Sequence, residues 1–157
     1  MNKIIFAERS SIDFVEEGKT LAPKFNSEGI IPVIVTETKS ELVLMLGYMN
    51  EEAFEQTIIT REAHYWSRSR ETLWKKGESS GMVHKVDEIL IDDDQDSVWL
   101  KVSIEGLGAS CHVGYKSCFY RSLDSVESGK VSLSFTESEK VFDPEEVYPG
   151  AENPTKL

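Results

Sequence analysis

Four aspartates stand within five positions of the segment ILIDDDQDSVWL, residues 89–100. Carboxylate oxygens are the ligands that hard cations such as Mg²⁺ and Mn²⁺ prefer. On an extended strand, Asp92, Asp94 and Asp96 would share one face, and Asp93 would point the other way. A straight strand would separate the Cα atoms of Asp92 and Asp96 by ~13 Å, so one shared ion requires a bend. The aspartates by themselves indicate either a metal site or a solvated acidic turn.

A second candidate site is the segment CHVGYKSC, in which Cys111 and Cys118 flank a loop containing Gly114. Such a loop would let both sulfurs reach one Zn²⁺. Two ligands do not complete a zinc site, so the others would come from a histidine, a carboxylate or water. The spacing is also compatible with two buried thiols and no metal, and by itself it favours that simpler interpretation.

Three histidines could carry acid–base chemistry. His112 is the best candidate because it is adjacent to a possible metal ligand. His64 lies in an aromatic segment, which is typical of a hydrogen-bonded core residue. His84 alternates with Met82 and Val86. If it has no functional role, it would simply face solvent.

A basic segment interrupts the acidic chain at residues 61–85. Its basic side chains are Arg61, Arg68, Arg70, Lys75, Lys76 and Lys85, against Glu62, Glu71 and Glu78. The loop KKGESSG, residues 75–81, offers ammonium groups, hydroxyls and glycine-exposed N–H groups that can hold a phosphate. Nearby Tyr65, Trp66 and Trp74 can stack on a base. The alternative is a set of core aromatics beside a solvated basic edge.

The elements that must position these residues follow from the apolar pattern. Two apolar runs at 29–37 and 41–49, with a polar turn between them, predict a β-hairpin. Asn50 as N-cap, with Phe54 and Ile58 on one face, predicts a helix over about 50–60. Further strands are predicted near His64, at 82–91, at 97–104 and at 130–135. The fold class is therefore α+β, mainly antiparallel sheet with one principal helix.

Length and composition limit the classes of function. A chain of 157 residues with 39% hydrophobic residues is expected to form one compact domain. Its net charge of -11 argues against nucleic-acid or anionic-membrane binding. The N-terminus has no apolar run of signal-peptide length, and no segment reaches the length of a membrane span, so a cytoplasmic location is expected.

Five segments in order resemble the phosphoribosyl-AMP cyclohydrolase family: GIIPVIV, LMLGYMNEEAF, AHYWSRSRETLWKKGESSG, IDDDQD and CHVGYKSCFYR. The likeness extends from about Phe25 to Arg121, and the tail segment KVFDPEEVY also fits. It implies one cyclohydrolase domain over 1–157, with its core at about 25–121 and a C-terminal strand and tail at 122–157. No fused pyrophosphatase domain is expected. The resemblance also implies an intertwined homodimer.

The activity implied by the resemblance is hydrolysis of the N1–C6 bond of the purine in 1-(5-phosphoribosyl)-AMP, a step of histidine biosynthesis. Asp92, Asp94 and Asp96 match the family's Mg²⁺ ligands, and Cys111 and Cys118 match two of its Zn²⁺ ligands. His112 is the candidate for proton transfer to the leaving nitrogen. The residues expected to bind the doubly phosphorylated substrate are Trp66, Arg68, Arg70, Trp74, Lys76, Ser79 and Ser80.

Asp93 departs from the family pattern, in which a cysteine at this position supplies the third zinc ligand across the dimer. A carboxylate also binds Zn²⁺, so Asp93, Cys111 and Cys118 would keep the site with an oxygen replacing one sulfur. That exchange weakens the preference for Zn²⁺ over Mn²⁺ or Fe²⁺. Three interpretations follow: an active cyclohydrolase with this site, a zinc-sparing paralogue that uses another metal, or a non-catalytic metal-binding homologue.

Overall fold

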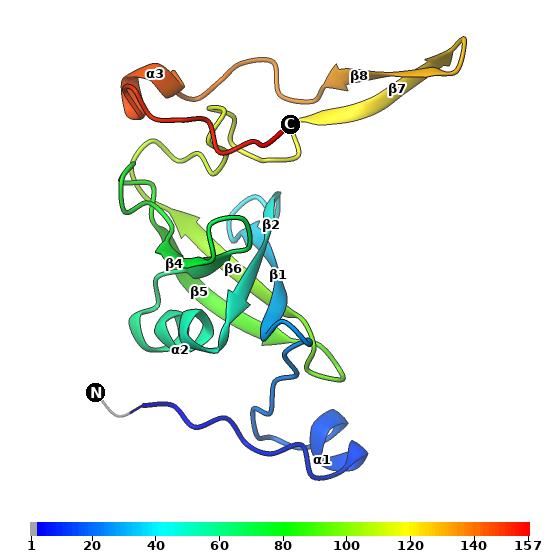
Figure 1. The fold of residues 1–157 in the computed structure, drawn as a ribbon, viewed down its shortest axis with the longest axis vertical. Coiled ribbons are helices and arrows are strands. Elements are labelled where there is room, and N and C mark those ends of the chain that lie inside the picture. Colours follow the sequence, from blue (N-terminus) through cyan, green and yellow to red (C-terminus); the bar gives the residue numbers. More distant parts are fainter. Residues whose placement is uncertain (1–2) are drawn as a thin grey trace.

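A computed structural model describes residues 3–157, which form eight strands and three helices (Figure 1). The strands are β1 (Ile30–Glu37), β2 (Val43–Asn50), β3 (His64–Ser67), β4 (Thr72–Lys75), β5 (His84–Ile91), β6 (Val98–Ile104), β7 (Arg121–Glu127) and β8 (Lys130–Phe135). The helices are α1 (Ile12–Glu16), α2 (Glu51–Thr60) and α3 (Pro144–Val147). Mostly antiparallel sheet with few, short helices confirms the predicted α+β class.

The core is built on a four-stranded sheet in the order β2-β1-β6-β5. The predicted hairpin is confirmed, because β1 pairs antiparallel with β2. On its other side β1 pairs parallel with β6, and β6 pairs antiparallel with β5. Val98, Leu100 and Val102 of β6 are all buried, as their alternation predicted. Strand β6 therefore lies inside the sheet, between β1 and β5.

Helix α2 covers one end of this sheet (Figure 1). The side chain of Asn50 accepts a hydrogen bond from the N–H of Ala53, which satisfies one of the unpaired donors of the first turn. Phe54 is fully buried in the core, and the helix ends at Thr60, followed by Arg61 as a C-cap with left-handed backbone. The predicted helix over 50–60 is confirmed in its bounds and its cap.

A separate hairpin, β7–β8, extends away from the central sheet at the C-terminal end of the molecule (Figure 1). Tyr115 and Tyr120 stack at its base with ring centroids 4.1 Å apart, and Phe135 packs on both rings. The sequence predicted β8, but it did not predict β7, whose polar residues RSLDSVE lack a buried face. No helix of residues 3–157 combines the length and the apolar character needed to cross a membrane.

Candidate functional site

The aspartates lie in a tight turn between β5 and β6 rather than on an extended strand. Gln95 has a φ of 57°, and this left-handed residue turns the chain back on itself. As a result, one carboxylate oxygen from each of Asp92, Asp94 and Asp96 lies within 4.8 Å of the others. The bend that one shared ion requires is present, in a turn rather than in an extended strand.

The carboxylate of Asp92 stabilises the turn by accepting hydrogen bonds from later residues of the same turn. Its Oδ1 accepts hydrogen bonds from the N–H groups of Asp96 and Ser97, at 2.9 and 3.0 Å. Its Oδ2 accepts one from the Ser97 hydroxyl at 2.5 Å. Burial opposes its ionisation, but the hydrogen bonds from Ser97 and Asp96 outweigh burial and lower the pKa of Asp92.

The same crowding has the opposite effect on Asp96. Burial, hydrogen bonding with Asp92 and the negative charges of Asp94 and Asp92 raise the pKa of Asp96. Three carboxylates held at this separation repel one another, at about 1 kcal/mol for each ionised pair in water-like surroundings. The donor set of three carboxylates fits a hard divalent cation, which would relieve that repulsion.

The two cysteines come together in a closed loop, residues 110–118, which follows the C-terminal end of β6 and is called the cysteine loop below. The N–H of Ser110 donates to the carbonyl of Lys116, and the N–H of Gly114 donates to the carbonyl of Cys111, at 2.8 and 3.0 Å. Gly114 has a φ of 108°, and a Cβ on it would lie 2.3 Å from the carbonyl oxygen of Phe142. Only glycine fits this loop without displacement of the backbone.

Cys111 is buried and Cys118 is exposed. A hydrogen bond from the Cys118 thiol lowers the pKa of Cys111 to about 6, and the charge of Lys76 acts in the same direction. The same hydrogen bond raises the pKa of Cys118. Zn²⁺ binds cysteine as thiolate, and these two adjacent sulfurs, of which Cys111 ionises first, are the donor type that the metal prefers.

His84 lies beneath the cysteine loop and is fully buried. Its Nδ1 is 3.0 Å from the Tyr65 hydroxyl, and its Nε2 is 3.1 Å from the Ser110 hydroxyl. Burial, reinforced by the charge of Lys76, lowers the pKa of His84 to about 3. The interpretation that His84 faces solvent is therefore wrong. The apolar Met82 and Val86 on the same face of the strand were the signal for burial.

Lys76 also faces the cysteine loop. Its ammonium group donates to the carbonyl of Ser110 at 2.5 Å and lies 5.6 Å from the ring centroid of Trp74. Burial lowers its pKa, whereas the nearby Cys118 and Cys111 raise it. The structure thus places this lysine against the candidate zinc ligands, and phosphate binding by Lys76 stays a prediction.

The other predicted substrate residues gather around the β3–β4 hairpin and the loop after it. The Arg68 guanidinium lies 4.0 Å from the ring centroid of Tyr48, and Arg70 Nε donates to the Ser67 hydroxyl at 3.2 Å. Trp74 packs against buried Tyr65 with ring centroids 5.1 Å apart. Trp66 is half-buried on β3, Ser79 is exposed, and the Ser80 hydroxyl accepts from Met82 at 3.2 Å.

His112 has an unused ring nitrogen. Its Nε2 is buried and has no hydrogen-bond partner among residues 3–157. Burial and the charge of Lys76 lower its pKa, which keeps the imidazole neutral at pH 7. A neutral histidine with a free nitrogen, next to Cys111 in the chain, can accept and return a proton.

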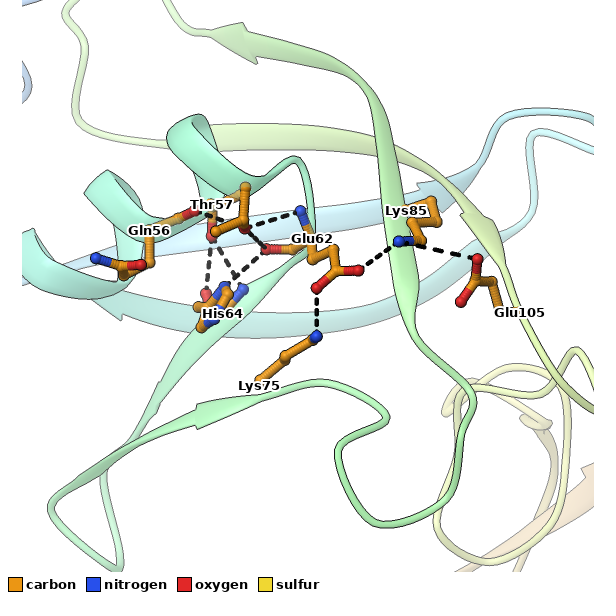
Figure 2. A network of polar contacts seen from close by, with 8 residues as sticks. Gln56, Thr57, Glu62, His64, Lys75, Lys85 and Glu105 are labelled. Carbon is orange, nitrogen blue, oxygen red and sulfur yellow. Dashed lines mark hydrogen bonds and ion pairs between the residues drawn. The ribbon is translucent and has the colours of Figure 1, made fainter. Parts of the chain in front are cut away.

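Part of the basic segment is neutralised within the fold (Figure 2). Glu62 forms ion pairs with both Lys75 and Lys85, and Lys85 also lies 3.9 Å from Glu105. Beside this network, Nδ1 of buried His64 lies 2.7 Å from the Glu62 carbonyl oxygen, which confirms the prediction of a hydrogen-bonded core histidine. Two of the six basic side chains therefore stabilise the junction of α2, β4 and β5.

Replacing Glu62 with glutamine is expected to lower the free energy of unfolding by about 1 kcal/mol at pH 7. Hydrogen bonds from Lys75 and Lys85 lower the pKa of Glu62 from 4.5 to about 2. The stabilisation is therefore complete above pH 4.5 and disappears as the pH falls towards 2. Urea denaturation at pH 7 and pH 3 measures this, with exposed Glu28→Gln as the control. An equal difference between parent and Glu62→Gln at both pH values would contradict it.

The two candidate metal sites lie at opposite ends of β6 (Figure 1). Asp93 precedes the strand and Cys111 follows it, so a strand of this length, about 20 Å, separates them within one chain. Among residues 3–157, Asp92, Asp94 and Asp96 make the one group of three or more side chains placed to share a metal. One copy of the chain does not bring Asp93 to the cysteines.

Comparison with known proteins identifies relatives of this chain. Residues 45–120, from β2 to the end of the cysteine loop, match the phosphoribosyl-AMP cyclohydrolase family. A phosphoribosyl-AMP cyclohydrolase of Rhodopseudomonas palustris strain BisB5 is 48% identical over 143 residues, which is 91% of this chain and 96% of the relative. This chain belongs to the phosphoribosyl-AMP cyclohydrolase family. It is therefore an enzyme, a hydrolase of histidine biosynthesis.

Two further relatives in this family support the assignment. The phosphoribosyl-AMP cyclohydrolase of R. palustris strain HaA2 is 50% identical over 142 residues, covering 90% of this chain and 95% of the relative. That of Nitrobacter hamburgensis is 45% identical over 139 residues, covering 88% and 93%. The resemblance found in five sequence segments is thus confirmed over most of the chain.

Proposed function

We propose that this protein hydrolyses the N1–C6 bond of 1-(5-phosphoribosyl)-AMP. The observation that carries the proposal is the near-50% identity to phosphoribosyl-AMP cyclohydrolases over about nine tenths of the chain. Water adds to C6, the N1–C6 bond breaks, N1 takes a proton, and C6 is left as a carboxamide. The chain's own residues must bind two phosphates, orient the purine and move that proton.

Asp92, Asp94 and Asp96 are proposed to hold Mg²⁺. Their convergence within 4.8 Å and the repulsion among their charges support this assignment. A magnesium ion here would bind phosphate oxygens of the substrate, which suits an acidic protein with a doubly phosphorylated ligand. Arg68, Arg70, Ser79 and Ser80, with Lys76, are the proposed protein contacts to the same substrate.

Cys111, Cys118 and Asp93 are proposed to hold a second metal, Zn²⁺ or in its place Mn²⁺ or Fe²⁺. Such an ion would supply Lewis acidity at C6 and lower the pKa of the attacking water. Since β6 separates Asp93 from the cysteines of the same chain, the three ligands would come from two copies in a homodimer. The proposed active site is therefore complete only in the dimer.

The β7–β8 hairpin supports association with a second copy. Its exposed apolar side chains are Leu123, Val126, Val131, Leu133 and Phe135. A hairpin that buries so few of its own apolar side chains is typical of an interaction surface. The partner favoured for this surface is a second copy of the chain, because Asp93 and the two cysteines lie too far apart in one copy to share a metal.

His112 is proposed to move the proton. Its lowered pKa leaves the ring neutral and ready to accept a proton from the attacking water. The resulting imidazolium then donates that proton to N1 as the N1–C6 bond breaks. The positive charge of Lys76 disfavours the imidazolium and so promotes this return of the proton.

The test is turnover of phosphoribosyl-AMP by the full chain, purified without added metal and assayed with Mg²⁺ plus Zn²⁺, Mn²⁺ or Fe²⁺. Metal content and mass in solution are measured on the same preparation. Ring opening by a dimer with one of these metals is the expected result. No ring opening with any of them would overturn the proposal in favour of a non-catalytic homologue.

Replacing Asp93 with cysteine is expected to shift metal preference towards Zn²⁺. A thiolate is a softer ligand than a carboxylate, so zinc affinity is expected to rise by about tenfold relative to Mn²⁺. Competition titration of the parent and Asp93→Cys with both metals measures this, and Asp93→Asn controls for the loss of charge. An unchanged preference would show that residue 93 is not a ligand, and would remove the case for a zinc-sparing paralogue.

A further inference from the structure

The turn that carries Asp92, Asp94 and Asp96 is held from outside by the N-terminal segment, residues 7–24, which we call the arm. The arm includes α1 and lies against the β5–β6 turn at the end of the sheet that is remote from the cysteines (Figure 1). It contributes no carboxylate to the turn's metal-ligating group. Its contacts go to two consecutive residues of the turn, Asp94 and Gln95.

Gln95 is the main connection, and it is 4% exposed. Its Oε1 accepts from the N–H of Ala22 at 2.8 Å, and its Nε2 donates to the carbonyl of Val15 at 2.9 Å. Nε2 also lies 3.4 Å from the Thr20 carbonyl oxygen, and the Lys24 N–H donates to the Gln95 carbonyl at 2.7 Å. The arm thus engages both the side chain and the backbone of this residue.

The left-handed conformation of Gln95 is what returns Asp96 towards Asp92 and Asp94. A residue with a β-carbon rarely adopts that conformation unless its surroundings hold it there. Buried hydrogen bonds to the arm are such surroundings, because breaking them would leave buried polar groups unpaired. Without them, repulsion among the carboxylates would favour a more open turn.

Arg9 makes the second connection. Its guanidinium donates to the carbonyl of Ala22 at 2.6 Å and to the carbonyl of Asp94 at 2.7 Å. One planar group thereby ties the arm to the residue before Gln95.

We propose that Arg9 and Gln95 are positioning residues for the cation site, through which docking of the arm and binding of a divalent cation at Asp92, Asp94 and Asp96 reinforce each other. This inference rests on the metal role proposed above for these aspartates. It adds that a segment outside the matched residues 45–120 sets the affinity of the site. By linkage, bound cation must stabilise the docked arm by the same factor by which docking tightens cation binding.

The first measurement is a titration of the full chain with Mn²⁺, followed by electron paramagnetic resonance. Gln95→Ala keeps a β-carbon at the left-handed position and removes the γ-methylene and the amide, and it is expected to weaken Mn²⁺ binding by ten- to a hundredfold. Arg9→Ala is expected to weaken it by about tenfold, and Arg9→Lys, which cannot reach both carbonyls, by less. Arg61→Ala, an exposed arginine at the end of α2, is the charge-matched control.

The second measurement distinguishes positioning from a general loss of stability. Hydrogen exchange at the N–H groups of Ala22 and Lys24 is compared with and without Mn²⁺. Added Mn²⁺ is expected to slow exchange at both in the parent and to have no effect in Asp94→Asn, which retains the backbone carbonyl bonded to Arg9. A purely structural role for Arg9 and Gln95 would not make arm exchange depend on the metal.

The outcomes separate failure of this inference from failure of the proposed metal site. If the parent and Asp94→Asn bind Mn²⁺ equally, the aspartates are not the site, and the proposed function loses its Mg²⁺ ligands. If Asp94→Asn loses binding while Arg9→Ala and Gln95→Ala stay within twofold of the parent, the coupling is overturned. Mn²⁺-independent exchange at Ala22 in a parent that binds Mn²⁺ would also overturn it.

Discussion

Replacing Cys111 with serine is expected to reduce turnover of phosphoribosyl-AMP by about a thousandfold while the chain stays folded. The lowered pKa of Cys111 makes it the member of the cysteine pair that is ionised near neutral pH. A serine hydroxyl does not ionise there, so the metal proposed at this site would lose a ligand and the reaction would lose its Lewis acidity. Metal content and kcat/KM of parent and variant measure the effect.

The comparison variant for Cys111→Ser is Cys118→Ser, which removes the other proposed ligand from the same loop. Both are expected to lose metal and turnover together. Circular dichroism of the metal-free proteins checks that the loop's surroundings remain folded, since the loop's backbone hydrogen bonds do not involve sulfur. Cys111→Ser protein that keeps its metal and stays within tenfold of parental turnover would remove Cys111 from the ligand set.

Acidification is expected to destabilise the parent by several kcal/mol through His84. The folded protein keeps this imidazole neutral down to a pKa of about 3, whereas the unfolded chain protonates it below its ordinary pKa of 6.5. The unfolded state therefore binds more protons between these values, and stability falls as the pH drops through that window. The loss approaches about 1.4 kcal/mol per pH unit.

The variant that tests this is His84→Gln, which keeps hydrogen-bonding atoms near Tyr65 and Ser110 but does not titrate. It is expected to be less stable than the parent by about 1–3 kcal/mol at pH 7. The difference should shrink as the pH falls from 6.5 to 5, a range above the Glu62 transition. Urea denaturation at pH 7, 6 and 5 measures it, and a constant difference would contradict the buried, neutral histidine.

Much of the fold follows from local patterns that tertiary packing did not override. The apolar runs of β1 and β2, the Asn50 cap of α2 and the alternation along β6 each agree with the observed elements. Strand β7 escaped prediction because its side chains are exposed, and a strand without a buried face has no period to detect. The short α1 and α3 also lack the length that produces a readable helical period.

The sequence predicted which residues could form the candidate site, but not how those residues are arranged in space. Asp92, Asp94 and Asp96 could be selected from their spacing, but their convergence depends on the left-handed backbone of Gln95. That conformation depends in turn on hydrogen bonds to residues such as Ala22, more than seventy positions away in the chain. No local pattern contains information about partners at that separation.

The sequence by itself determined the fold class, the family and the side chains available for chemistry, because these depend on residue type and short-range spacing. Only the tertiary structure decided which of them meet. It placed Lys76 against the cysteine loop, buried His84 beneath that loop, and separated Asp93 from Cys111 by the length of β6. The physical reason is that contacts between distant segments arise from packing and long-range hydrogen bonds, which the order of residues along a strand does not specify.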